Sequence, residues 1–169
     1  MDDISLRALG LALVLLLAIA AFFSIAETAM MAVNRYRLKH RARKGERGAR
    51  LTLQLLDKTD KLHGVILLAN TLVNAGAAAL TAVIIKRLFG EGELALGLGT
   101  LAIAFAILVF SEITPKVIGA AHADRIASPV SFLLAPMLKA ATPVVWFVNL
   151  FVQALLKLLR INTVGEADA

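Results

Sequence analysis

The chain of 169 residues contains no cysteine, which excludes a disulfide framework, a thiolate metal site and a cysteine nucleophile. Charged and aromatic side chains are also scarce, at 18% and 6% of the residues. A soluble domain has about 25% charged and roughly 45–50% apolar residues, whereas 59% of this chain is hydrophobic and its mean hydropathy is +0.80. A soluble core of this size cannot bury so much apolar surface, and the same figures exclude intrinsic disorder.

Long apolar stretches, in contrast, are abundant. Three of them cover about residues 9–33, 62–85 and 94–114. A helix rises about 1.5 Å per residue, so roughly 20 residues cross a hydrocarbon core of about 30 Å. The sequence therefore predicts three transmembrane helices. A cleaved signal peptide in place of the first is disfavoured, because residues 1–7 are net acidic.

The basic residues are unevenly distributed along the chain. Residues 34–61 contain ten Lys or Arg against three acidic residues, a net +7, so the remainder is −1 in a chain of +6. The positive-inside rule places this loop and the C-terminus in the cytoplasm, and the N-terminus and the turn at 86–93 outside. No aromatic interleaving or binding motif accompanies the charge, so we expect contact with membrane lipids and not with nucleic acid.

Residues 124–160 are apolar enough to span a membrane, but prolines interrupt them at seven-residue steps: Pro129, Pro136 and Pro143. Proline breaks the hydrogen-bond ladder of a helix. A fourth crossing would also leave Lys157 and Arg160 outside, against the positive-inside rule. We therefore expect a broken belt of short helices at the membrane interface, with a fourth span as the alternative.

The expected fold class is an all-α integral membrane protein with three transmembrane helices plus interfacial or belt helices on the cytoplasmic side. Residues 1–162 are expected to form one transmembrane domain, with residues 34–61 as its basic cytoplasmic loop. Residues 163–169 are expected to be a truncated linker toward an absent cytosolic domain.

Polar side chains inside these spans indicate function, because they are expensive in a membrane. Each span carries such a cluster near the end predicted to be cytoplasmic, and the candidate metal ligands are Ser24, Glu27, Asn70, Asn74, Ser111 and Glu112. The spacing within the first two clusters places their members on one helix face. Hydroxyl, amide and carboxylate oxygens are hard donors, which suit Mg²⁺, Ca²⁺ or Na⁺.

Pro115 adds a backbone carbonyl oxygen to this set of candidate ligands. It has no N–H, so in a continuing helix the carbonyl of Ser111 would lose its hydrogen-bond partner. A free carbonyl in a membrane is tolerated only beside protein, water or a ligand.

Structural interpretations of the same residues remain open. The asparagines could form hydrogen bonds between helices, Glu27 could pair with Arg35, and Glu112 could pair with Lys116 one turn later. No role is assigned to the histidines, which lack ligand spacing: His40, His63 and His122.

These clusters resemble the transmembrane domain of the CorC/CNNM (cyclin M) family of magnesium transporters. The markers are the runs Phe22–Thr28, Asn70–Asn74 and Ser111–Lys116, and the likeness covers about residues 5–162. It implies membrane helices with an added belt, a homodimer, and an inward-facing cavity that binds Mg²⁺ in each subunit. It further implies transport coupled to Na⁺ and a cytosolic pair of CBS domains in the full-length chain.

By resemblance the ion site includes Ser24, Asn70 and Glu112, with Glu27 and Asn74 close by. The sequence departs from the family's pattern at Ala26, where a second small polar residue is common, and at Thr71, where a second Asn is common.

The function predicted is export of Mg²⁺ across the plasma membrane, with Na⁺ as the coupling ion. The alternative is a membrane-embedded divalent-cation sensor or scaffold, which would bind the ion without moving it. An enzyme is not expected, because the sequence has no nucleophile–base pair and no HExxH metal motif.

Overall fold

The computed structural model describes residues 4–160, and all regular structure in this range is helical. The helices follow one another as α1 (Leu6–Ala32), α2 (Arg35–Arg43), α3 (Arg47–Leu56), α4 (Thr59–Phe89), α5 (Glu93–Ala106), η1 (Ile107–Ile113), α6 (Thr114–Ala121) and α7 (Ala123–Leu158). The prediction of an all-helical membrane fold is confirmed.

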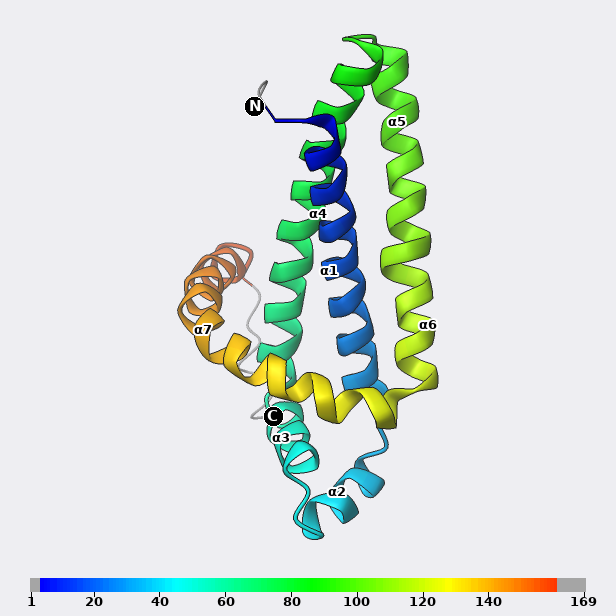
Figure 1. Cartoon of the computed structure of the whole chain (residues 1–169). Helices are drawn as coiled ribbons and strands as arrows, with labels where there is room; N and C mark the ends of the chain where they lie inside the picture. The colour runs from blue at the N-terminus through cyan, green and yellow to red at the C-terminus, as the bar shows by residue number, and fades with distance from the viewer. Residues whose placement is uncertain (1–3, 161–169) are drawn as a thin grey trace.

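Three long helical rods stand side by side: α1, α4 and the unbroken succession α5–η1–α6 (Figure 1). Each is long and apolar enough to cross a membrane. The second and third rods extend beyond the predicted spans, since the second begins at Thr59 and the third continues across Pro115 to Ala121. Helix α1 lies between the other two and contacts both.

Helix α7 corrects the expectation of a broken belt. Residues 123–158 form one continuous helix of 36 residues, which by length and composition is a fourth candidate membrane span. Its prolines at seven-residue steps recur after about two turns and so lie on one face, because a helix has 3.6 residues per turn. The lost hydrogen bonds then accumulate on one side and bend the helix instead of breaking it.

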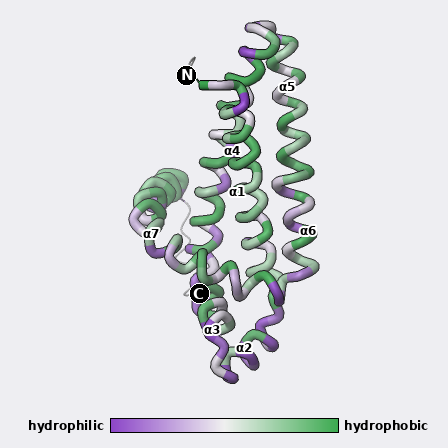
Figure 2. Tube along the Cα trace, in the orientation of Figure 1, coloured by the Kyte–Doolittle hydropathy of each residue, from purple (hydrophilic) through white to green (hydrophobic). Residues whose placement is uncertain are grey.

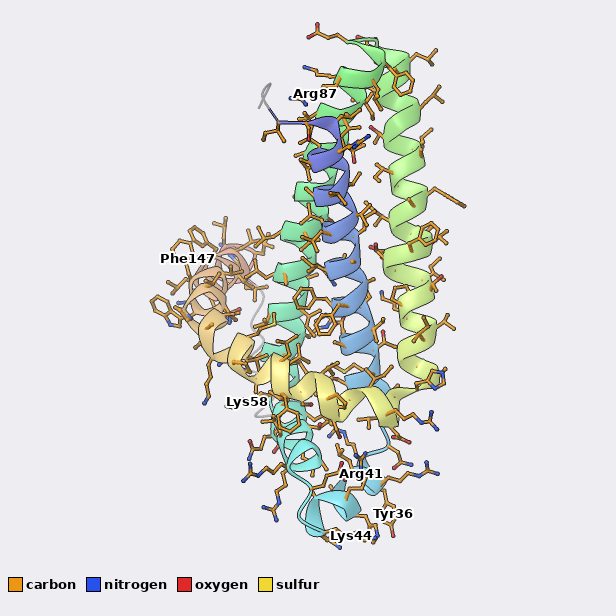
Figure 3. All side chains as sticks on the ribbon, viewed as in Figure 1. Tyr36, Arg41, Lys44, Lys58, Arg87 and Phe147 are labelled. Atoms are coloured by element: carbon orange, nitrogen blue, oxygen red, sulfur yellow. The ribbon has the colours of Figure 1, made fainter. Side chains whose placement is uncertain are left out.

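The bend is plain in Figure 1, where α7 first runs across one end of the bundle and then curls away from the viewer. We call this end, which carries α2, α3 and the first half of α7, the basal end. Figure 2 shows that hydrophobic residues follow the three rods while hydrophilic ones gather on α2 and α3. In Figure 3, Tyr36, Arg41 and Lys44 lie at the basal end and Arg87 lies at the opposite end.

The basic loop folds into a helical hairpin, α2–α3, which turns at Gly45 with φ of +95°. The Asn34 side chain caps α2 by accepting hydrogen bonds from the backbone N–H groups of Tyr36 and Arg37. On α3 the apolar residues gather on one side, and Thr52 forms a buried hydrogen bond of 2.7 Å with Ser131 of α7. The hairpin is therefore packed against α7.

Asp124 at the start of α7 fastens the hairpin. Its carboxylate accepts a hydrogen bond from the Asn34 backbone N–H at 3.2 Å and pairs with Arg37 at 3.3 Å, and its backbone carbonyl accepts from Arg41 at 3.3 Å. Arg41 also donates to Glu46 across the turn, which lowers the pKa of that carboxyl and raises the pKa of the guanidinium.

The buried core lies toward the basal end and joins α1, α4, α7 and the hairpin through Phe23, Met30, Leu38, Leu62, Ile66 and Leu134. On its other side α1 meets α6 at very short range. A Cβ on Gly119 would lie 2.7 Å from the Ile25 carbonyl oxygen, closer than real contacts permit. This close approach fixes the height of α6, and therefore of η1, against α1.

Candidate functional site

A cavity of about 640 Å³ opens between the three rods in their basal half. Its lining comes from α1, α4, η1 and α6 and consists of Ser24, Glu27, Thr28, Met31, His63, Leu67, Asn70, Thr71, Asn74, Glu112 and Lys116. The three polar clusters, which lie far apart in the sequence, thus surround one space. Of the six candidate ligands, Ser111 is the one that does not line it.

On α1, Ser24 is buried at 3% exposed, and the side chain of Glu27 is 18% exposed. Glu27 forms an ion pair with the imidazole Nδ1 of His63 on α4 and none with Arg35. His63, to which the sequence assigned no role, therefore belongs to the cavity. The signal that could have identified it is its spacing, because it lies seven residues, about two turns, before Asn70 on the same helix face.

On α4, the side-chain oxygens of Asn70 and Asn74 are buried and have no hydrogen-bond partner within residues 4–160. The interpretation of these asparagines as links between helices is therefore not supported by their amide oxygens. An unpaired buried acceptor costs about 1–3 kcal/mol, and such groups in native structures call for an explanation. Two of them four residues apart in one cavity are acceptors with room for a donor or a cation.

The third rod changes its hydrogen-bond register where it reaches the cavity. Residues 107–113 form a π-helix, and the N–H of Thr114 donates to the carbonyl of Val109, five residues back. Ser111 is buried and its hydroxyl donates to the Leu17 carbonyl of α1 at 3.0 Å, while Glu112 lines the cavity.

The π-helix was not foreseen, although π-turns occur mostly at functional sites. Pro115, which follows it, was expected to free the carbonyl of Ser111. The helix does continue across Pro115, as that expectation required, and the release of this particular carbonyl stays a prediction.

The remaining lining residues complete the chemistry of the cavity. Thr71 donates to the Leu67 carbonyl of its own helix at 2.8 Å. Lys116 is exposed and forms no ion pair with Glu112 within residues 4–160. No group of three or more His, Cys, Asp or Glu gathers in metal-binding range within the same residues. The available donors are therefore mixed: two carboxylates, two amides and the hydroxyls of Ser24 and Thr28.

The three apolar rods and the intramembrane polar cavity together define a multi-pass membrane protein. The chain belongs to the family of the cyclin M transmembrane N-terminal domain, whose model matches residues 11–169. Assignment to this family confirms the resemblance drawn from the sequence.

Similar proteins occur in bacteria and plants. The inner membrane protein YfjD of Escherichia coli is 42% identical over 145 residues, which cover 86% of this chain and 33% of that protein. A Haemophilus influenzae protein of the same group is 39% identical over 96% of this chain and 38% of its own length. A chloroplastic protein of Arabidopsis thaliana, At1g55930, is 32% identical over 95% of this chain and 24% of its own. The chain thus spans about a third of its bacterial relatives.

Proposed function

We propose that this domain transports Mg²⁺ across the membrane through the cavity between α1, α4 and η1–α6. The observation that carries the proposal is the pair of buried, unpartnered amide oxygens of Asn70 and Asn74, which share one cavity with the carboxylate of Glu112. Three separate helices supply oxygen donors to this space, so a shift of one helix changes the coordination.

The donor chemistry favours a small hard cation. Mg²⁺ takes about six oxygen ligands near 2.0–2.1 Å and usually keeps several of its waters. Ser24, Asn70 and Glu112 would hold the ion, with Asn74 beside them. Glu27 would also bind the ion once its carboxylate no longer contacts His63. The side chain of Ser111 is the poorest candidate ligand, because its hydroxyl donates a hydrogen bond to the backbone of α1.

The positive charge of the hairpin orients the molecule. Residues 34–61 carry a net +7, and all of α2 and α3 lie at the basal end (Figure 1). By the positive-inside rule this end faces the cytoplasm, so the cavity is inward-facing and the N-terminus lies outside. The first half of α7, which runs across the same end (Figure 1), would then lie at the cytoplasmic surface beside three spans. The name of the E. coli relative supports the plasma membrane as the location.

The remaining features of the proposal come from the family resemblance. They are assembly as a homodimer, coupling of transport to Na⁺, and cytosolic CBS domains in the longer protein. The proposed activity is transport, with no catalytic step.

Flux through reconstituted vesicles tests the proposal. Purified protein in liposomes, with Na⁺ on the side opposite to Mg²⁺, should move Mg²⁺ across the membrane, as reported by a trapped indicator. The substitution Glu112→Gln should reduce this flux about tenfold or more, because a neutral amide cannot replace the carboxylate charge. Glu93→Gln, at the opposite end of the same rod, is the matched control and should transport normally.

Two results would contradict the proposal. Equal flux for Glu112→Gln and the control would remove Glu112 from the pathway. Binding of Mg²⁺ to wild-type protein, seen as thermal stabilisation, without any flux would identify a sensor or scaffold in place of a transporter.

A further inference from the structure

A second opening lies beside the ion cavity, between the first turns of α4 and the second half of α7. It consists of two adjoining hollows that share Gly64, Val145 and Asn149. The inner hollow, of about 340 Å³, lies beside the ion cavity, and the outer hollow, of about 420 Å³, lies at the basal start of α4. Residue numbers on both helices increase from the outer hollow to the inner one, so the two hollows form one continuous opening between α4 and α7. We call the two hollows together the furrow.

The furrow changes in character along its length. The inner hollow is lined mainly by aliphatic side chains, including Leu67, Leu68, Val148 and Val152. Several of these are well exposed, with Leu67 at 58% and Val152 at 43%. An apolar groove that stays open in a membrane protein suits a hydrocarbon chain.

The outer hollow, in contrast, is polar. It is lined by Asp60, Lys61, Thr142 and Trp146. Within residues 4–160, Asp60 and Lys61 form no ion pair, and the Trp146 indole N–H donates no hydrogen bond. A carboxylate, an ammonium and an indole N–H are therefore free at the mouth. Tryptophan is typical of the membrane interface, where one end of the ring is apolar and the other wet.

From Asp60 to Thr71 the furrow follows α4 for 11 residues, or about 17 Å, of which the apolar inner hollow from Gly64 to Thr71 takes about 10 Å and the polar outer hollow the rest. We propose that the furrow binds a zwitterionic, amine-bearing phospholipid of the phosphatidylethanolamine type. One acyl chain fills the inner hollow, Lys61 and Trp146 bind the phosphate, and Asp60 binds the amine.

The charges at the mouth decide between lipid classes. A purely anionic headgroup would bring a negative charge to Asp60, and like charges in contact are unfavourable. A zwitterionic headgroup satisfies both Asp60 and Lys61. Because Leu67 and Thr71 line the ion cavity as well as the furrow, a bound acyl chain would shield that cavity on one side from the surrounding lipid. The lipid site itself does not depend on which ion the cavity takes.

The glycines of the chain offer a matched pair of variants. An added Cβ at Gly64 in the furrow, or at Gly97 on α5, meets no atom within 4 Å. Gly64→Phe should therefore fill the furrow without forcing the helices apart, and Gly97→Phe should add the same side chain elsewhere. Wild-type protein and Gly97→Phe, purified in mild detergent, should be thermally stabilised by added dioleoyl phosphatidylethanolamine, and Gly64→Phe should not.

Lys61→Gln tests the headgroup independently of the furrow's shape. Loss of a charge-assisted hydrogen bond should weaken binding of the same lipid about tenfold, measured by titration of the melting temperature. Lipid that copurifies with each variant, quantified by mass spectrometry, should follow the same order.

Three outcomes would overturn the proposal. Gly64→Phe could retain lipid and its stabilisation as wild type does. Phosphatidylglycerol could stabilise the protein as well as or better than phosphatidylethanolamine, which would refute the assigned headgroup. Loss of self-association in Gly64→Phe with unchanged lipid content would show that a second copy of the chain occupies the furrow.

Discussion

The unpaired amide oxygens of Asn70 and Asn74 are the most informative atoms of the molecule. Protein interiors seldom leave such acceptors unsatisfied, because each one sacrifices hydrogen bonds to water without replacement. Two of them in one cavity are costly to a folded protein that binds nothing there. A cation bound as proposed would supply the missing partner, so the proposal links stability to ion binding at these positions.

This linkage predicts opposite effects of one substitution under two conditions. Asn74→Leu removes an unpaired acceptor while keeping the size of the side chain, so without divalent ions the free energy of unfolding should rise by about 1 kcal/mol. The same variant should lose the stabilisation by Mg²⁺ that the proposed site predicts for wild-type protein. Thermal melts in chelator and in excess Mg²⁺ measure both effects. A variant that keeps the full Mg²⁺ shift would show that Asn74 is not a ligand.

At the level of single residues, the sequence predicted most of the polar residues that line the cavity, but not the hydrogen bonds and ion pairs that they form. Ser24, Glu27, Asn70, Asn74 and Glu112 could be chosen because each polar group is costly inside an apolar span. Their hydrogen bonds and ion pairs could not be chosen, since these depend on how the helices are rotated against each other. Hence the sequence offered Arg35 or another basic residue of the following loop as a possible partner of Glu27, whereas the structure pairs it with His63 of α4.

Among the helices, the third rod is the one whose position against α1 matters most, because it brings Glu112 to the cavity. Gly119 permits the contact, since any Cβ there would meet the Ile25 carbonyl oxygen at 2.7 Å and Thr28 at 3.1 Å. Backbone atoms cannot move aside as a flexible side chain can. The distance between α1 and α6 is therefore set by the absence of a side chain at this position.

Gly119→Ala should accordingly destabilise the protein by about 1–3 kcal/mol, the usual range for overpacking. It should also weaken Mg²⁺-dependent stabilisation, because Glu112 moves with the rod. Gly10→Ala in α1 is the control, since its Cβ meets nothing within 4 Å and alanine favours a helix by about 0.5–1 kcal/mol. Denaturant unfolding compares the two, and equal stabilities would argue against the tight contact.

The α2–α3 hairpin carries a pH-dependent contact. The hydrogen bond from Arg41 lowers the pKa of Glu46 below its ordinary value of 4.5, so the pair stabilises the folded state above the unfolded pKa and loses this effect as pH falls through the folded one. Wild-type protein should therefore melt above Glu46→Gln at pH 7, with the gap closing below about pH 4. A gap that persists in strong acid would contradict this interpretation. The effect should be small, because the pair is exposed.

Two features of the elements could not be read from the sequence. The π-helix at residues 107–113 carries no residue pattern that would mark a change of register within the apolar third rod. In α7, each proline was correctly expected to remove a hydrogen bond. The combined effect was misjudged, because three losses on one face produce a curve where three losses on different faces would have interrupted the helix.

For the whole molecule, the separation of charge between its two ends predicts which way the cavity faces. The absence of cysteine makes this testable with single introduced thiols. Tyr36 at the basal end is 83% exposed, and the side chain of Glu91 at the opposite end is 87% exposed. In intact cells a membrane-impermeant maleimide should label Glu91→Cys at once and Tyr36→Cys only after permeabilisation. The reverse pattern would invert the topology and make the cavity outward-facing.

The junction between α6 and α7 has a mechanical consequence. His122 alone separates the helix that follows Glu112 from the helix that runs across the basal end, and a joint of one residue has almost no slack. A tilt of α7 is therefore expected to be passed to α6, and with it to the segment that carries Glu112. Asp124, just past the joint, also binds the hairpin, so α2 and α3 are connected to the proposed ion site through α6 and the single residue between the two helices.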